Sequence, residues 1–157
     1  MLMTTPAAPE LQHFAALEVE VGPPIEVGRT ARGLRRVIPI TGGRASGDGW
    51  TARVMPGGAD FQLVVGETQA ELQAHYVLEL DGGDRIYVHN SALRHAPPEV
   101  TARLLRGELV DPALVYFRCL PRLETAAPSL AWVNERLFVG TGVRLPSCVQ
   151  MQFFVLA

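Results

Sequence analysis

Recurring glycines and prolines cut the chain into short apolar segments, and this pattern limits the folds that it can adopt. The sequence contains 15 glycines and 12 prolines, more than the roughly 12% that these two residues make up in an average chain. Between these breaks, apolar and polar residues alternate with a period of two, as in residues 16–21, which is typical of a half-buried strand. Many short strands joined by tight turns predict an all-β sandwich or barrel.

Nine segments have this strand pattern, and we favour a closed, mainly antiparallel β-barrel built from them. A barrel of about eight or more strands leaves no open edge and can hold a small ligand, whereas an open sandwich would expose its edges. The sequence Asp81-Gly82-Gly83-Asp84 is typical of a hairpin turn between two of the segments. The expected strands cover residues 16–21, 35–40, 50–55, 61–65, 72–80, 85–90, 114–120, 131–139 and 148–156.

A single helix is expected near residues 98–106. Pro97-Pro98 precedes it, Glu99 lies in its first turn, and Gly107 follows its last turn, which carries arginine. This is the usual order of helix start and stop signals. Val100 and Leu104 share one side at a spacing of four residues, so the helix should be short and half-buried.

The length of 157 residues predicts one domain. We place this domain at residues 13–157, after a flexible segment of residues 1–12. A hydrophobic content of 48% with 19% charged residues excludes a disordered chain. The net charge of −2 offers no basic excess for binding nucleic acid. We find no signal peptide and no apolar run long enough to span a membrane, so we expect a cytoplasmic protein without membrane partners.

The residues that commonly carry metal or nucleotide chemistry are scattered. Cys119 and Cys148 lie in separate apolar runs and are expected to be inert thiols. The four histidines are not spaced as metal ligands, and the glycine pairs do not form a phosphate loop. No serine lies in a nucleophile-elbow motif. We therefore expect neither a metal nor a cofactor.

Five stretches together are similar to the bacterial and fungal family catalogued as domain of unknown function 3237. The likeness runs in order from about residue 13 to the carboxy terminus. It is carried by residues 36–43 (RVIPITGG), 54–62 (VMPGGADFQ), 81–94, 116–118 leading to 123–125 (YFR, LET), and 131–134 leading to 137–140 (AWVN, LFVG).

This resemblance implies a closed barrel of lipocalin-like or allene-oxide-cyclase-like shape with a central cavity. It implies no reaction, because the family has none assigned. The chain also departs from the family pattern, with Phe61 in place of a usual tryptophan, Leu80 in place of a threonine and Ala92 in place of a glycine. The first two changes make their surroundings less polar.

Polar side chains within the apolar segments are the candidates for a site inside the barrel. A charge in an apolar strand is costly unless it meets a partner, a ligand or water. Arg118 is a candidate anion clamp, with Asp60 and Glu124 as acid/base groups. The site residues that we expect to converge, or to bind a ligand beside them, are Asp60, Tyr76, Arg94, Tyr116, Arg118, Glu124, Trp132 and Asn134.

Structural alternatives exist for each main candidate. Asp60 can instead accept hydrogen bonds from nearby glycine amides in a turn. Arg118 can form an ion pair that closes the barrel. Trp132 can fill the core while Asn134 bonds a loop.

Two functions fit these residues. The first is binding of a small, largely apolar organic acid or phenolic molecule in the central cavity. The alternative is a cofactor-free acid/base enzyme, an isomerase, cyclase or lyase, acting on such a molecule. The last strand carries large apolar groups on both faces, so we also expect a homodimer.

Overall fold

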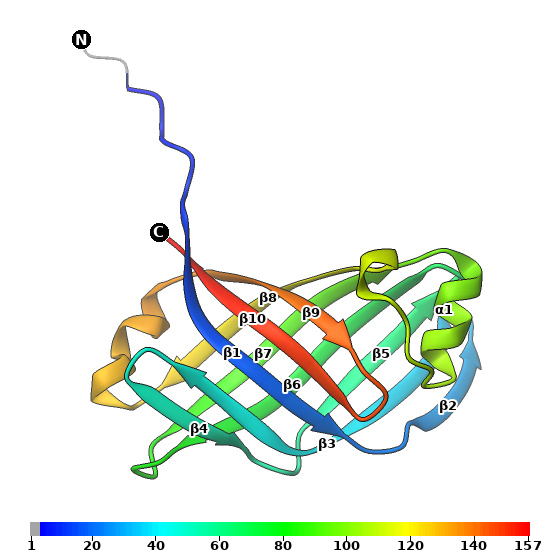
Figure 1. Ribbon diagram of the computed structural model, residues 1–157, viewed down its shortest axis with the longest axis horizontal. Helices are drawn as coiled ribbons and strands as arrows, with labels where there is room; N and C mark the ends of the chain where they lie inside the picture. The colour runs from blue at the N-terminus through cyan, green and yellow to red at the C-terminus, as the bar shows by residue number, and fades with distance from the viewer. Residues whose placement is uncertain (1–3) are drawn as a thin grey trace.

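The computed structural model describes residues 4–157, which form a closed antiparallel barrel of eight strands with two additional strands (Figure 1). A closed barrel is the predicted fold class. The elements, in chain order, are β1 (Leu11–Val21), β2 (Ile25–Thr30), β3 (Gly33–Gly47), β4 (Trp50–Val54), β5 (Ala59–Val65), β6 (Gln69–Leu80), β7 (Arg85–His95), α1 (Pro98–Leu105), η1 (Pro112–Leu114), β8 (Tyr116–Thr125), η2 (Pro128–Glu135), β9 (Phe138–Arg144) and β10 (Cys148–Leu156).

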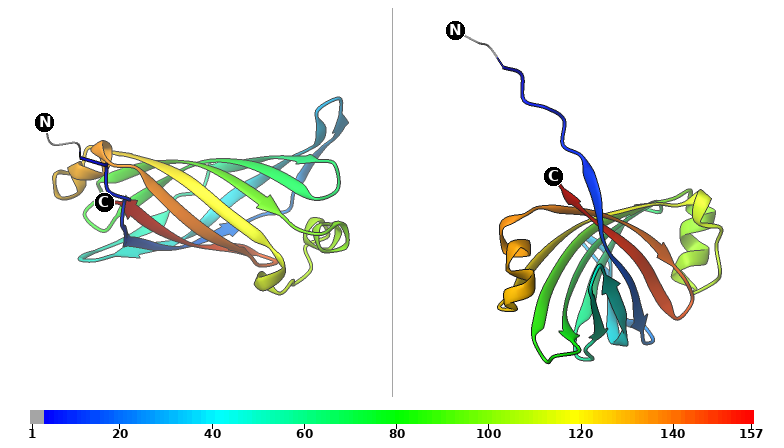
Figure 2. Two further views of the ribbon diagram at one scale, coloured as in Figure 1. Left: turned by 90° about the horizontal axis from the view of Figure 1, so that it is seen from above. Right: turned by 60° about the vertical axis from the view of Figure 1, so that its left-hand side comes forward.

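Strand β3 allows the barrel to close. Strands β6 to β10 are each antiparallel to the next, and β1 pairs with both β10 and β3. The first half of β3 lies between β2 and β5, and its second half lies between β1 and β4. Figure 2 shows the strands wrapping around the barrel axis, with α1 and η2 at opposite ends.

Strand β3 continues through the glycine pair at which we expected a strand to end. Gly43 has a φ of 127° and lies opposite Val19 of β1. A side chain at this position would collide with the backbone of Glu18. Glycine therefore lets β3 bend and approach β1 closely without ending the strand.

The segment predicted as a strand at residues 131–139 is wrong in its first half. The structure has the 3₁₀ helix η2 there, and β9 begins only at Phe138. Pro128 occupies the first turn of η2, where its missing N–H costs no hydrogen bond. Leu130 and Val133, three residues apart, are the two buried side chains of this helix. The backbone is kinked at Leu130, and such a short, irregular segment has no periodicity by which the sequence could distinguish it from a strand.

Several strands are longer than expected, since β7 continues to His95 and β8 to Thr125, five residues beyond their expected ends. Helix α1 lies where it was predicted, with Val100 and Leu104 buried. Strand β2 was not predicted. Strand β1 begins at Leu11, and the backbone of Glu10 exchanges two hydrogen bonds with Ala157. Backbone pairing thus begins at Glu10, before residue 13, where we expected the domain to begin. Residues 1–3 of the expected flexible segment lie outside the described part of the chain.

The two ends of the barrel interior differ in polarity. The end covered by η2 is filled by apolar side chains, among them Phe14, Val133 and Phe138. At the other end, the buried Arg36 donates to Glu26 Oε1 of β2 at 2.8 Å and to the Leu105 carbonyl of α1 at 3.1 Å. These bonds attach both elements to β3.

Candidate functional site

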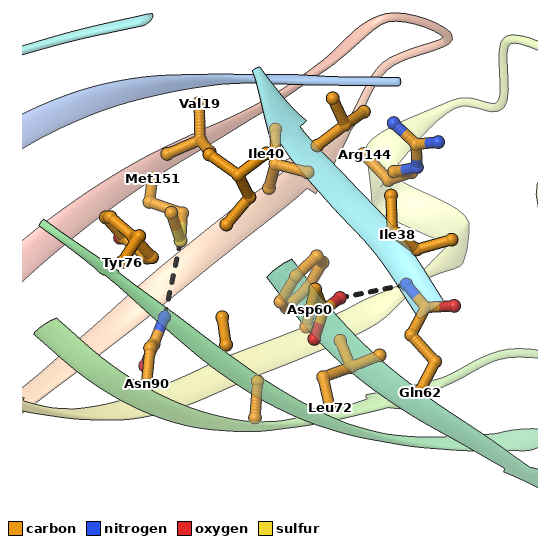
Figure 3. A pocket seen from close by; sticks show the side chains of 15 residues that line it. Val19, Ile38, Ile40, Asp60, Gln62, Leu72, Tyr76, Asn90, Arg144 and Met151 are labelled. Carbon is orange, nitrogen blue, oxygen red and sulfur yellow. Dashed lines mark hydrogen bonds between the residues drawn. The ribbon is translucent and has the colours of Figure 1, made fainter. Parts of the chain in front are cut away.

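A cavity of about 40 Å³ lies inside the barrel between the apolar core and the end covered by α1. By volume it has room for about three water-sized groups. Most of its wall is apolar. Its polar side chains are Asp60, Gln62, Tyr76, Asn90 and Arg144 (Figure 3).

Strand alternation and one small residue position these polar groups. Asp60 on β5 lies opposite Ala74 on β6, and Ala74 lies opposite Asn90 on β7. The three residues form one row across the inner wall. Because alanine is the smallest of them, it leaves open space between the aspartate and the asparagine.

Two hydrogen bonds hold polar groups at the cavity wall. Gln62 Nε2 donates to Asp60 Oδ2 at 2.9 Å, and Asn90 Nδ2 donates to the sulfur of Met151 at 3.4 Å. Both bonds are drawn in Figure 3. They orient the carboxylate and the two amides, and they leave the second carboxylate oxygen and both amide oxygens unused.

Four buried oxygens in this wall have no hydrogen-bond partner among residues 4–157. They are Asp60 Oδ1, Gln62 Oε1, Tyr76 Oη and Asn90 Oδ1. An unpaired buried polar group typically costs about 1–3 kcal/mol, so native proteins contain few of them. All four belong to residues that line the same cavity. Three are acceptors and the fourth is a hydroxyl, so they suit a ligand that donates hydrogen bonds.

Burial dominates the acid/base properties of the site. It raises the pKa of Asp60, an effect only partly opposed by the bond from Gln62 and by the charges of Arg94 and Arg144. Asp60 as a whole residue is partly exposed, but its Oδ1 is inaccessible. Burial also raises the pKa of Tyr76, so the phenol stays protonated.

Two further arginines lie at the α1 end, beside Arg36. Arg94 is only 4% exposed, and within the described chain its side chain makes no hydrogen bond and no ion pair. Burial lowers the pKa of Arg94 to about 10. Arg144 is half-buried, lines the cavity, and donates from Nη1 to the Leu145 carbonyl at 2.6 Å.

The structure brings only some of the predicted site residues together. Asp60 and Tyr76 line the cavity, as expected. Arg94 is buried two residues after Ala92 on the same face of β7, and it is Ala92 that lines the cavity. Tyr76 points inward together with Leu78, as the period of two predicted.

The expected convergence of the β8 residues on the interior is wrong. Arg118 and Glu124 are exposed on the outer face, as is Tyr116, over whose ring the Arg118 guanidinium lies at 5.2 Å. Phe117 and Cys119, the neighbours of Arg118, are buried instead. Burying these two apolar groups and leaving the charge in water is the cheaper arrangement.

Trp132 and Asn134 lie on η2, at the apolar end of the barrel. Trp132 is 41% exposed and packs edge-on against Phe14 at 5.3 Å. Asn134 Oδ1 accepts from the Thr125 N–H at 2.8 Å, and its Nδ2 donates to the Thr125 carbonyl at 2.8 Å. Asn134 thus bonds a chain segment, which was the structural alternative.

Sequence reasoning missed three polar residues of the cavity. Asn90 continues the inward alternation of Ile86 and Val88, and this signal was available in the sequence. Gln62 likewise lies two residues after Asp60. Arg144 had no such signal, because it precedes a turn in a glycine-containing strand.

The cavity wall thus combines unpaired hydrogen-bonding oxygens with a carboxyl group whose pKa is raised by burial. Across residues 4–157 no three histidine, cysteine, aspartate or glutamate side chains are grouped as a metal site would need. None of the helices described is long and apolar enough to cross a membrane.

The chain is therefore a β-barrel protein, with eight strands in the closed barrel and a cavity of mixed polar and apolar lining. The sequence profile of the family "Protein of unknown function (DUF3237)" matches residues 9–156. The chain therefore belongs to this family, and the resemblance inferred from the five stretches is confirmed.

Relatives support the same assignment. A UPF0311 protein of Clostridium acetobutylicum is 36% identical over 147 residues, covering 93% of each chain. A crystal structure of a conserved protein of unknown function from Rhodopseudomonas palustris is 38% identical, with a TM-score of 0.89 over 98% of this chain and 100% of that one. A β-barrel-like protein from Acinetobacter baumannii is 34% identical, with a TM-score of 0.86 over 99% and 100%.

Proposed function

We propose that the protein binds a small, largely apolar organic acid or phenolic molecule in its central cavity. One observation carries the proposal: every buried side-chain oxygen that lacks a partner in the described chain lies in the wall of this cavity. A ligand hydroxyl that donates to Asp60 or Asn90 would replace hydrogen bonds that burial has removed. Because the cavity has room for only about three water-sized groups, it would receive the hydroxyl end, and the rest of the ligand would extend along the apolar wall toward Arg144.

Calorimetric titration with phenol and with toluene tests this binding. The two probes have similar shapes, but only phenol carries a hydroxyl. We expect phenol to bind about tenfold or more tightly than toluene, since one satisfied buried hydrogen bond is worth about 1–3 kcal/mol. Replacing Tyr76 by phenylalanine should reduce that difference, whereas Tyr87→Phe on the outer face should not. Equal affinities for both probes would contradict the proposal.

The second candidate is acid/base catalysis in the same cavity, as an isomerase, cyclase or lyase. The specific observation in its favour is Asp60, whose pKa burial raises. A carboxyl group that exchanges its proton near working pH is suited to general acid or base catalysis. Incubation with cyclohexanone in D₂O distinguishes the two functions. A catalyst would introduce deuterium beside the carbonyl, and Asp60→Asn would not, whereas a binding protein leaves the ketone unlabelled.

We also propose that the protein forms a homodimer, through the outer face of β7 and β8. The last strand, on which we based this expectation, directs Met151, Phe153 and Val155 into the core and exposes Gln150 and Gln152. Its apolar residues are therefore mostly used inside the barrel. A more apolar outer surface is the groove that holds Leu93, Tyr116 and Leu120, which are 39%, 52% and 60% exposed.

Charge complementarity favours a second copy as the occupant of this groove. Leu93 lies between Glu71 on β6 and Arg118 on β8 in the strand register, and both charged residues line the groove. Neither forms an ion pair within residues 4–157. In a twofold dimer whose axis runs along β7 over Leu93, each Arg118 would face the partner's Glu71.

A further inference from the structure

The positive charge around the buried Arg94 exceeds what the carboxyl groups near it can balance. Three arginines gather there, and Arg94 senses the charges of Arg36, Arg144 and Asp60. Glu26 pairs with Arg36 at 2.8 Å and so balances one of them. Asp60 is the other carboxyl group, and burial favours its neutral form.

Arg94 is the residue at the α1 end of the barrel that is best suited to bind an anion. Its side chain is buried, yet it has no hydrogen bond and no ion pair in the described chain. A largely buried guanidinium without an anion is costly, because burial removes much of its hydration and no partner replaces it. Arg36 shows the contrast: it is equally buried, but Glu26 and the Leu105 carbonyl both accept its hydrogen bonds.

Arg144 provides a second cation at the entrance of the cavity. It lines the cavity while remaining half-exposed, so this side of the cavity reaches solvent. In Figure 3, Tyr76 and Asn90 lie on one side of the pocket and Arg144 on the other, with Asp60 between them. Apolar side chains, among them Ile38 and Leu72, line the space that separates the two sides.

We propose that Arg94 and Arg144 bind the carboxylate of a hydroxy acid whose hydroxyl end lies among Tyr76, Asn90 and Asp60. This assignment rests on the proposed binding function and narrows its ligand to a molecule with a hydroxyl, an apolar spacer and a carboxylate. Guanidinium groups suit a carboxylate because their paired N–H groups match its two oxygens. The small volume inside the barrel receives the hydroxyl end, and the carboxylate stays near the entrance.

Titration with 4-hydroxybenzoate and with its methyl ester tests the proposal, because only the acid carries the negative charge. We expect wild-type protein to bind the acid about tenfold or more tightly than the ester. Arg94→Met should remove most of that preference while changing the affinity for the ester less than about twofold. Arg122→Met, which alters an exposed arginine of β8, should leave both affinities unchanged.

Thermal unfolding shows whether Arg94 is a ligand-binding or a structural cation, independently of ligand. Methionine has a similar length and no charge to bury, so Arg94→Met should match or exceed the melting temperature of the ligand-free wild type. A large drop in melting temperature would mean that Arg94 is needed for folding and would overturn the proposal.

The remaining outcomes separate this inference from the proposed function. If acid and ester bind wild type equally well, the carboxylate site is wrong while binding in the cavity stands. If neither binds, both are wrong. If inorganic phosphate displaces the acid at equal concentration, the arginines form a general anion site, and the assignment to an organic carboxylate is overturned.

Discussion

Asp60 makes the stability of the barrel depend on pH in an unusual direction. Burial raises its pKa above the ordinary value of 3.8. Between these two pKa values the folded chain binds more protons than the unfolded chain, so stability falls as pH rises through this window. Most carboxylates in proteins act in the opposite sense, because ion pairs and hydrogen bonds lower their pKa values.

We predict that Asp60→Asn becomes progressively more stable than wild type as pH rises. The amide oxygen can still accept the bond from Gln62, but nothing at position 60 ionises. The gain should reach about 1.4 kcal/mol for each pH unit between the folded and unfolded pKa values, and level off above the folded pKa. Urea denaturation from about pH 4 to 8 measures it.

Asp84→Asn, at an exposed turn position, is the matched control and should show no such trend. If wild type and Asp60→Asn keep a constant difference across the series, the carboxyl group is not held neutral by burial. Acid/base catalysis by Asp60 would then lose its physical basis.

At the scale of elements, the 3₁₀ helix η2 is attached to β8 by one side chain. Asn134 bonds both the N–H and the carbonyl of Thr125, and donates to the Ala131 carbonyl at 3.1 Å. We expect Asn134→Ala to cost about 1–2 kcal/mol, because water can satisfy part of what is lost at this exposed position. Urea denaturation should show this loss, with Ser129→Ala of the same helix as a near-neutral control.

Ligand binding should respond differently to the same substitution. Since η2 covers the end of the barrel opposite α1, Asn134→Ala should leave the affinity for phenol unchanged. A loss of affinity beyond that expected from partial unfolding would mean that Asn134 contributes to ligand binding.

At the scale of the whole molecule, the proposed dimer depends on charges that match only across a twofold axis. Arg118→Glu would place like charges opposite each other and should shift the protein to monomer in light scattering at micromolar concentration. Adding Glu71→Arg to this variant exchanges the two charges and should restore the dimer. Arg32→Glu, in the exposed turn between β2 and β3, should have no effect. A monomeric wild type would end the proposal.

Local sequence patterns were enough to predict the barrel class, the position of α1 and the inward direction of Tyr76. These features depend on local information, namely turn residues and the signals at helix ends. They also depend on the alternation of apolar residues, which identifies the inward face of a strand when one face is clearly apolar. The family profile adds that the whole described barrel belongs to one known family.

Which charges meet depended on the tertiary structure. The inward face of β8, in contrast, could have been predicted, because Phe117, Cys119 and Leu123 alternate with charged residues along the strand. The cavity itself joins Asp60, Asn90 and Arg144 from three strands. Their proximity follows from strand register and barrel closure. Both depend on many pairings between distant parts of the chain, which a local sequence pattern does not specify.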